Sequence, residues 1–221
     1  HLILQEVCHG GPSYDDGGCM SHRMLEDVAR LKLQYPERVH FLISNHELAE
    51  LTDYPIMKAR KMLNILFRTG LQNCYGSEAE RVRLAAIGFI GTCPAAARIG
   101  QRVFVSHSLP ERGDHDGIDV SIFSRSPTNR DQCEGGALFR MVWGRDFRHA
   151  NAEAYARAVN ADVLIHGHEP CAEGFRVLND RQIILDCCGP RPHIAVVPTS
   201  GDLSFRAVAG TIRPLAPIEL E

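Results

Sequence analysis

Residues 35–47 read YPERVHFLISNHE, and this stretch decides the fold. The run VHFLI at 39–43 predicts a buried strand, because a short apolar run bounded by turn residues is typical of one. Pro36 restricts the residue before it and therefore ends a helix upstream. Asn45, His46 and Glu47 follow directly after the strand. The strand thus carries an amide, an imidazole and a carboxylate to one edge of a sheet.

A second short, buried strand is predicted upstream at residues 2–6, where the chain reads LILQE. Apolar residues recur at near-helical spacing over 20–33, which predicts a helix between the two strands. Residues 10–18 are rich in Gly, Pro, Ser and Asp, so we expect a loop there. Together, a strand, a helix and a strand form a parallel crossover unit.

Downstream patterns predict a mixed α/β chain without internal repeats. Helices are expected at residues 55–69, 77–90 and 150–159, and strands at 102–106 and 162–165. The polar, irregular stretch at 114–131 predicts a segment that loops out over the protein surface. Segments joined by turns predict an antiparallel set of strands at 175–178, 182–186, 193–197 and 203–208.

The composition is that of a globular protein long enough to bury a core. The 221 residues are 44% hydrophobic and 23% charged, with a net charge of −3 and a pI of about 6.4. The sequence has no basic stripe, so we expect no nucleic-acid partner. No apolar run approaches the ~20 residues that cross a bilayer, so no membrane partner is expected. The sequence does not reveal the oligomeric state.

The cysteines indicate the cellular compartment of the protein, and the first residues indicate how the chain begins. Eight cysteines occur without any CxxC pair, which argues against a structural zinc site. Cys187 and Cys188 are adjacent, which suits reduced thiols, so we expect a cytoplasmic protein. No signal-peptide pattern occurs. The chain starts inside an apolar strand, from which we expect an N-terminal segment to be missing.

Polar residues occur repeatedly where predicted strands end. Glu6, Asn45, His107 and His168 each lie at or just after an apolar run. Ligands of open α/β sheets bind at the carboxyl ends of strands, so these four side chains are candidates for one site. Arg145, in the run VWGRD, adds a planar fork that suits a phosphate.

Each of these residues also has an ordinary structural explanation. Asn45 is a good helix N-cap, and a lone His107 is most often a histidine satisfied in a turn. The run HGH at 166–168 suits a polar turn after a strand, and Glu6 suits a solvated loop. Arg145 suits a surface ion pair with the aspartate that follows it. The order and spacing of the elements decide between the two interpretations.

Taken in order, these elements resemble the calcineurin-like metallophosphoesterases, and within them the bacterial-type phosphoprotein (serine/threonine) phosphatases. The runs YPERVHFLISNHE, FVSHSLP, VWGRD and LIHGHEPCAEGF resemble the family's Gly-Asn-His-Glu, Phe-Val-His-(Ala/Gly)-Gly-Leu, Trp-x-Arg and Gly-His-(Thr/Glu)-Pro elements. The matches extend from residue 2 to about residue 197. The resemblance implies a β-sandwich of mixed sheets flanked by helices in four layers (α/β/β/α). It implies a single domain over residues 1–221 that lacks its N-terminal strand.

The resemblance also implies a centre of two divalent metal ions. Asn45, His107 and His168 match ligands of the family's second metal, and Glu6 takes the place of the aspartate that bridges both metals. Nitrogen and oxygen ligands of this kind suit Mn, Fe or Zn. The family supplies further ligands to the first metal from a Gly-Asp-x-His-Gly motif, which would precede residue 1.

The implied activity is hydrolysis of a phosphate ester, on a phosphoprotein or a small phosphate monoester. In the family a metal-bridging hydroxide attacks phosphorus. His46 matches the histidine that protonates the leaving alcohol, and Arg145 matches an arginine that holds the phosphate. His9 takes the place of the aspartate that supports the proton donor, so we expect a weakened or altered acid step.

Departures from the family pattern keep other functions open. Glu6 replaces an aspartate, and Gly10 takes the place of a phosphate-binding arginine. A second alignment sets residues 13–18 against Asp-x-x-Asp-Arg-Gly and makes Ser13 the bridging ligand. We prefer Glu6 because it ends a strand. The alternative function is a degenerate, weakly active or inactive module that binds or regulates, and a mononuclear metal protein ranks last.

Overall fold

The structure is a computed structural model that describes residues 1–215. The chain divides into two compact units, His1–Ala95 and a second unit that begins at Ala96. Both units combine helices with strands, so the mixed α/β class predicted from the sequence is confirmed. Among the described residues, no helix has both the length and the apolar character that a bilayer crossing demands.

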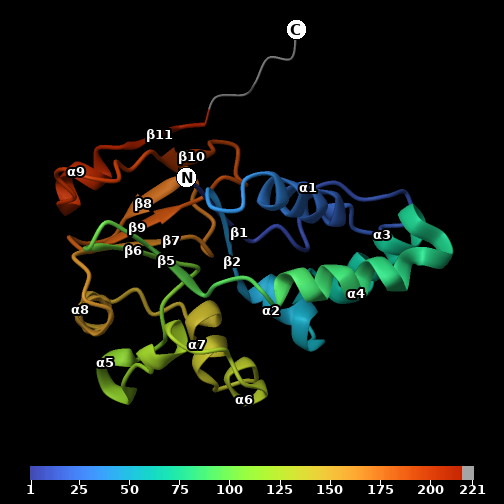
Figure 1. Cartoon of the computed structure of the whole chain (residues 1–221), viewed down its shortest axis with the longest axis horizontal. Helices are drawn as coiled ribbons and strands as arrows, with labels where there is room; N and C mark the ends of the chain where they lie inside the picture. Colours follow the sequence, from blue (N-terminus) through green and yellow to red (C-terminus); the bar gives the residue numbers. More distant parts are fainter. Residues whose placement is uncertain (216–221) are drawn as a thin grey trace, which may run out of the picture. The chain divides into compact units, whose positions relative to one another are not determined.

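The first unit is built on the predicted strand–helix–strand element. Strand β1 (Leu2–Gln5) pairs in parallel with β2 (Val39–Leu42), and α1 (Ser21–Gln34) connects them (Figure 1). The register sets Leu2 opposite Val39 and Gln5 opposite Leu42. Both strands therefore end at the same edge, because parallel partners run in one direction. The prediction that the first strand is buried is wrong, since Leu2 is exposed and the other residues of β1 are only half-buried.

Three further helices complete the first unit: α2 (Asn45–Thr52), α3 (Leu63–Tyr75) and α4 (Ala79–Ile90), the last preceded by a 3₁₀ turn at Gly76–Glu78. Their apolar faces bury large side chains completely, including Leu48, Phe67, Leu71 and Ile90. Burial of such side chains is the main stabilising term of a core of this kind.

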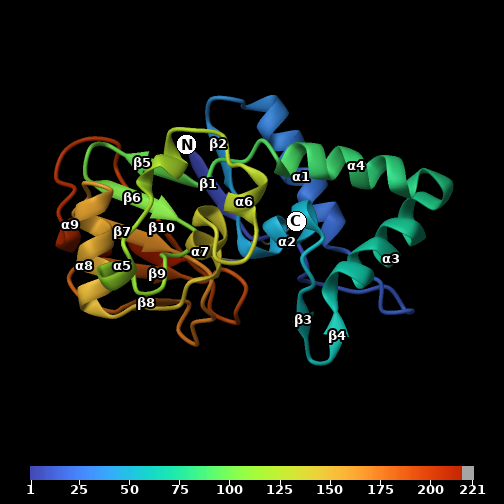
Figure 2. The ribbon, with the colours of Figure 1, turned by 90° about the horizontal axis from the view of Figure 1, so that it is seen from below.

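The helix predicted over residues 55–69 is wrong in its first half. A short hairpin precedes the helix, formed by β3 (Met57–Lys58) and β4 (Lys61–Met62), and Figure 2 shows it as a narrow projection. Ala59 and Arg60 both adopt left-handed φ angles, as the two-residue turn of a tight hairpin requires. The turn geometry overrides the helical propensity of the stretch.

The second unit contains a five-stranded mixed sheet in the order β5-β6-β7-β9-β8. Its central strands β6 (Val103–Ser106), β7 (Val163–His166) and β9 (Gln182–Leu185) are parallel, whereas β5 (Ala96–Ile99) and β8 (Phe175–Val177) pair antiparallel at its two sides. Every residue of β6 and β7 is buried. Parallel strands of this type are typically apolar on both faces.

The connection from β6 to β7 contains the helices α5 (Gly113–Asp116), α6 (Asn129–Gln132), α7 (Ala137–Trp143) and α8 (His149–Ala158), with a 3₁₀ turn at Val120–Phe123. The segment 114–131 thus holds helical turns rather than only irregular chain. The helix predicted over 150–159 is confirmed as α8, whose Ala152 and Tyr155 are fully buried.

The last predicted strand, at residues 203–208, is wrong. That segment forms α9 (Phe205–Ala209), because the Ser204 side chain caps the helix by accepting a hydrogen bond from the backbone N–H of Ala207. Strand β10 (His193–Ala195) instead pairs antiparallel with β11 (Ile212–Pro214). The turn at residues 179–180 joins β8 to β9 as predicted.

Candidate active site

The first group of predicted site residues lies at the start of α2. Ser44 is the N-cap, and its hydroxyl oxygen accepts hydrogen bonds from the backbone N–H groups of His46 and Glu47, at 3.1 and 3.4 Å. Asn45 is therefore not the cap, which removes the ordinary explanation offered for it. It is the first residue of the helix and is only 2% exposed. Asn45 and His46 are adjacent in the sequence shortly after β2, so both lie at the start of α2.

Glu47 ties the loop after β1 to α2. Its Oε1 atom accepts hydrogen bonds from the backbone N–H groups of Val7, at 2.9 Å, and Cys8, at 2.8 Å. Its Oε2 atom accepts the hydroxyl proton of Ser44. The side chain is fully buried. This role of Glu47 was not predicted from the sequence, although a Ser-x-x-Glu spacing is typical of a capping box.

Four side chains form a contiguous cluster beside this loop. His46 Nε2 lies 3.6 Å from Glu6 Oε1, and His46 Nδ1 lies 3.1 Å from His9 Nδ1. On its other side, His9 Nε2 lies 2.7 Å from Glu50 Oε1. Glu50 was missed by the sequence analysis. Its position four residues after His46 on a helix is the signal that places both on one face.

The backbone of this loop adopts sparsely populated conformations. Glu6 has a φ of 54° and His9 has a φ of 64°, both in the left-handed region. Non-glycine residues rarely occupy this region, and it is enriched at functional sites because the surrounding structure must hold the strain. Here the Glu47 carboxylate, bonded to the two residues between them, supplies that restraint.

Cys8 lies within the same loop but is unsuited to act as a nucleophile. It is 2% exposed, and burial raises the pKa of its thiol well above the usual range, with the Glu47 carboxylate adding to the effect. The thiolate is the reactive form of cysteine, so a raised pKa keeps this side chain inert. The chemistry of the cluster therefore rests on its imidazoles and carboxylates.

In the second unit, two predicted ligands meet at the ends of adjacent strands. His107 directly follows β6, and His168 follows β7 after one glycine. His107 Nε2 lies 2.8 Å from His168 Nδ1, with the rings edge to face. His107 is fully buried, and His168 has a φ of 68°. The pairing of β6 with β7 is what brings these imidazoles together.

The separation of these two nitrogens suits a shared cation. Imidazole nitrogens bind transition metals at roughly 2.0–2.1 Å, so two neighbouring ligands of one ion lie about 3 Å apart. Neutral imidazole is also the commonest metal ligand in proteins. The donor set in the second unit therefore fits a divalent metal of the zinc or manganese type.

His166 takes no part in this pair, although it is only two residues from His168. Its side chain is fully buried, with Nδ1 3.4 Å from the Ser106 hydroxyl, and its ring stacks on Tyr155. Burial lowers the pKa of His166 to about 4. It is a neutral core histidine, because its ring is buried against Tyr155.

Arg145 follows α7 and pairs with Glu169, the residue after His168. The arginine side chain is half exposed. The ordinary explanation for Arg145 was an ion pair with Asp146. Asp146 instead pairs with Arg148 at 2.6 Å, and that hydrogen bond lowers the pKa of Asp146. A guanidinium with one exposed side is suited to take a second anion.

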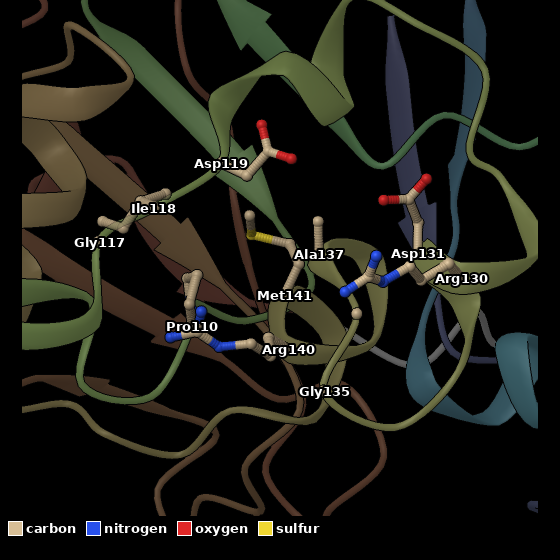
Figure 3. Close-up of a pocket in the computed structure, with 11 residues that line it drawn as sticks. Pro110, Gly117, Ile118, Asp119, Arg130, Asp131, Gly135, Ala137, Arg140 and Met141 are labelled. Carbon is tan, nitrogen blue, oxygen red and sulfur yellow. The ribbon is translucent and has the colours of Figure 1, made fainter.

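A separate cavity of about 240 Å³ lies among the short helices of the second unit. Figure 3 shows Arg130, Arg140 and Met141 around it. Of the two carboxylates in its lining, Asp131 is bonded to Arg125 at 2.6 Å and Asp119 lies 3.4 Å from the same arginine. None of the residues predicted for the site lines this cavity.

Comparisons with known proteins bear on the fold. No protein-family model and no curated protein sequence matches this chain. The structure is similar to that of a protein serine/threonine phosphatase from Saccharomyces cerevisiae with similarity to human phosphatase PP5 (TM-score 0.63, 12% identity). That match covers 99% of this chain and 80% of the other. A cold-active protein-tyrosine phosphatase from a psychrophilic Shewanella also matches, with a TM-score of 0.49, 14% identity and coverage of 83% and 70%. At 12% identity, the yeast protein shows a shared fold.

Proposed function

We propose that this chain is a metal-dependent phosphate ester hydrolase of the calcineurin-like metallophosphoesterase type. The proposed substrates are phosphoproteins, as for a serine/threonine phosphatase, or related small phosphate monoesters. The observation that carries the proposal is the His107–His168 pair, whose facing nitrogens lie 2.8 Å apart where β6 and β7 end. The fold likeness to a serine/threonine phosphatase supports it.

The proposed cofactors are two divalent cations, Mn, Fe or Zn, held by Glu6, Asn45, His107 and His168. A carboxylate, an amide oxygen and two imidazoles make a mixed donor set that suits these borderline ions. Bound cations of this kind withdraw charge from phosphate oxygens and acidify water. The resemblance to the family assigns these four residues.

Two side chains of the chain itself carry the remaining chemistry. As the ester bond breaks, the electron pair stays on the leaving oxygen, and His46 Nε2 donates a proton to it. Arg145 holds the phosphate through its planar fork, exchanging Glu169 for the substrate. We further propose the four-layer α/β/β/α architecture, a single functional domain over residues 1–221, and a cytoplasmic location.

The first test measures metal content and hydrolysis of p-nitrophenyl phosphate in Mn²⁺ by the full-length protein, including any residues that precede His1. Wild type is compared with His46→Ala and Asn45→Ala, and with His149→Ala as an exposed control. We expect two metals per chain, activity lost by at least ~100-fold in His46→Ala, and an unchanged control. One metal or less, with no turnover above the two variants, would refute the hydrolase.

A regulatory or binding module without turnover is the second candidate. The Arg145–Glu169 ion pair favours it, because it occupies the proposed phosphate ligand. So do Glu6 and Gly10, which stand in place of an aspartate and an arginine of the family. Binding of inorganic phosphate with no hydrolysis in any metal would select this function.

A further inference from the structure

We propose that Glu50 is a positioning residue that acts through His9 to set the tautomer and orientation of His46. The inference rests on the proposed function, in which His46 donates the proton to the leaving oxygen. It assigns Glu50 and His9 the task that a single carboxylate performs in the family that the sequence resembles. The Glu50 carboxylate thus acts on the proton donor His46 indirectly, through the imidazole of His9.

The three side chains form a continuous chain of short contacts. Glu50 Oε1 lies 2.7 Å from His9 Nε2, and His9 Nδ1 lies 3.1 Å from His46 Nδ1. Both contacts are within hydrogen-bonding distance for nitrogen and oxygen atoms. The His9 ring is also held edge-on against Phe67, with the ring centres 5.8 Å apart. The position of His9 between its two partners is therefore fixed by packing.

The direction of the hydrogen bonds follows from the carboxylate. An ionised carboxylate only accepts, so His9 must carry its proton on Nε2. The Nδ1 atom of neutral His9 is then an acceptor and takes the Nδ1–H of His46. His46 Nε2 is left to carry the proton that is transferred. After that transfer the leaving group is a neutral alcohol, and His46 is neutral with its proton on Nδ1.

The burial of Glu50 is hard to explain by stability. The Glu50 side chain is 1% exposed and that of His9 is fully buried. Within residues 1–215, Glu50 Oε2 has no hydrogen-bond partner. Burying a carboxylate with incomplete hydrogen bonding costs several kcal/mol in general. Attachment of the β1 loop to α2 does not require Glu50, since Glu47 already bonds to two backbone N–H groups of that loop.

The tautomers can be measured without turnover. We expect ¹⁵N NMR of the metal-free full chain to show His9 protonated at Nε2 and His46 protonated at Nδ1 near neutral pH. In Glu50→Gln the His9 signal should shift toward a mixture of tautomers, while Glu26→Gln, on α1, should leave both histidines unchanged. A His9 protonated at Nδ1 in the wild type would overturn the proposal.

The effect on catalysis depends on the leaving group. Phenol is a poor leaving group that needs the proton, whereas 2,4-dinitrophenolate leaves without it. We expect Glu50→Gln to lower kcat for phenyl phosphate by roughly 10- to 100-fold and kcat for 2,4-dinitrophenyl phosphate by less than about 2-fold. An equal loss on both substrates would assign Glu50 a merely structural role. Absence of wild-type turnover on either substrate would refute the hydrolase itself.

A double-mutant cycle tests whether Glu50 works through His9. The variant His9→Asn keeps an acceptor near the position of Nδ1 but cannot reach Glu50. We expect it to retain most activity on phenyl phosphate, and Glu50→Gln to have no further effect in that background. Additive losses would contradict the relay. Urea midpoints of each variant identify any that fail to fold, and Glu50→Asp serves as a second variant, expected to act like Glu50→Gln because it is too short.

Discussion

The imidazole of His107 lies against that of His168, Nε2 to Nδ1 at 2.8 Å, although 61 residues separate them in the chain. The contact exists because β6 and β7 are parallel neighbours with Val105 opposite Ile165, so the residues that follow them leave the sheet at one edge. The 2.8 Å separation is a hydrogen-bonding distance, and it also suits two ligands of one cation.

Removal of either histidine should abolish metal binding at this position. We expect His107→Ala and His168→Ala each to lose at least one equivalent of metal and to reduce phosphatase activity by more than ~100-fold. Mass spectrometry of the metal content and p-nitrophenyl phosphate turnover check this. The exposed His149→Ala is the control and should keep both. Full metal content in the His107 variant would exclude this pair as ligands.

Glu169→Gln should strengthen phosphate binding. The Glu169 carboxylate occupies the Arg145 guanidinium, and a neutral amide competes less well with an anion. We expect the inhibition constant of inorganic phosphate to fall by roughly 2- to 10-fold, measured by competition. Glu173→Gln, which releases the exposed Arg191 instead, should change nothing. Weaker phosphate inhibition in Glu169→Gln would show that Arg145 does not contact the substrate.

Glu47→Ala should destabilise the first unit. The change leaves the backbone N–H groups of Val7 and Cys8 without their acceptor. Unsatisfied buried donors cost roughly 1–3 kcal/mol each, so we expect a loss of about 3 kcal/mol in the free energy of unfolding. Urea denaturation provides the value. The exposed Glu78→Ala should lie within about 0.5 kcal/mol of wild type.

Asp131 should make the second unit sensitive to acid. Its bonds with Arg125, and with Thr128 in the capping box of α6, hold the pKa of its carboxyl well below the usual range. Because its pKa is lowered in the folded state, the ionised Asp131 carboxylate stabilises the protein at pH values above the unfolded-state pKa of about 3.9. This stabilisation is lost as the pH falls through the folded-state pKa.

We therefore expect Asp131→Asn to cost about 1–2 kcal/mol at pH 7 and progressively less below pH ~4. Urea midpoints at pH 7, 5 and 3 measure the difference from wild type. Asp27→Asn, at an exposed site on α1, is the comparison and should show no such trend. A difference for Asp131→Asn that stays constant with pH would show that its charge is not involved.

The local pattern of the sequence determined much of the fold. The apolar runs that became β2, β6 and β7 could be predicted because burial on both faces leaves a continuous apolar signature. Polar residues directly after these runs marked where the strands end, which placed Asn45, His107 and His168 as candidates. Such features depend on neighbouring residues, so the order of residues is sufficient to find them.

Only the tertiary structure decided which distant groups meet. Neither the bond of Glu47 to the β1 loop nor the contact of Glu50 with His9 has a local signature, because each joins residues about 40 positions apart. The hairpin at 57–62 and the helix α9 depended on turn and cap geometry that outweighed the apolar pattern. The sequence thus determined the strands and the kinds of side chain at their ends. The tertiary structure decided the hydrogen-bond partners, because those arise from chain crossings that no short stretch encodes.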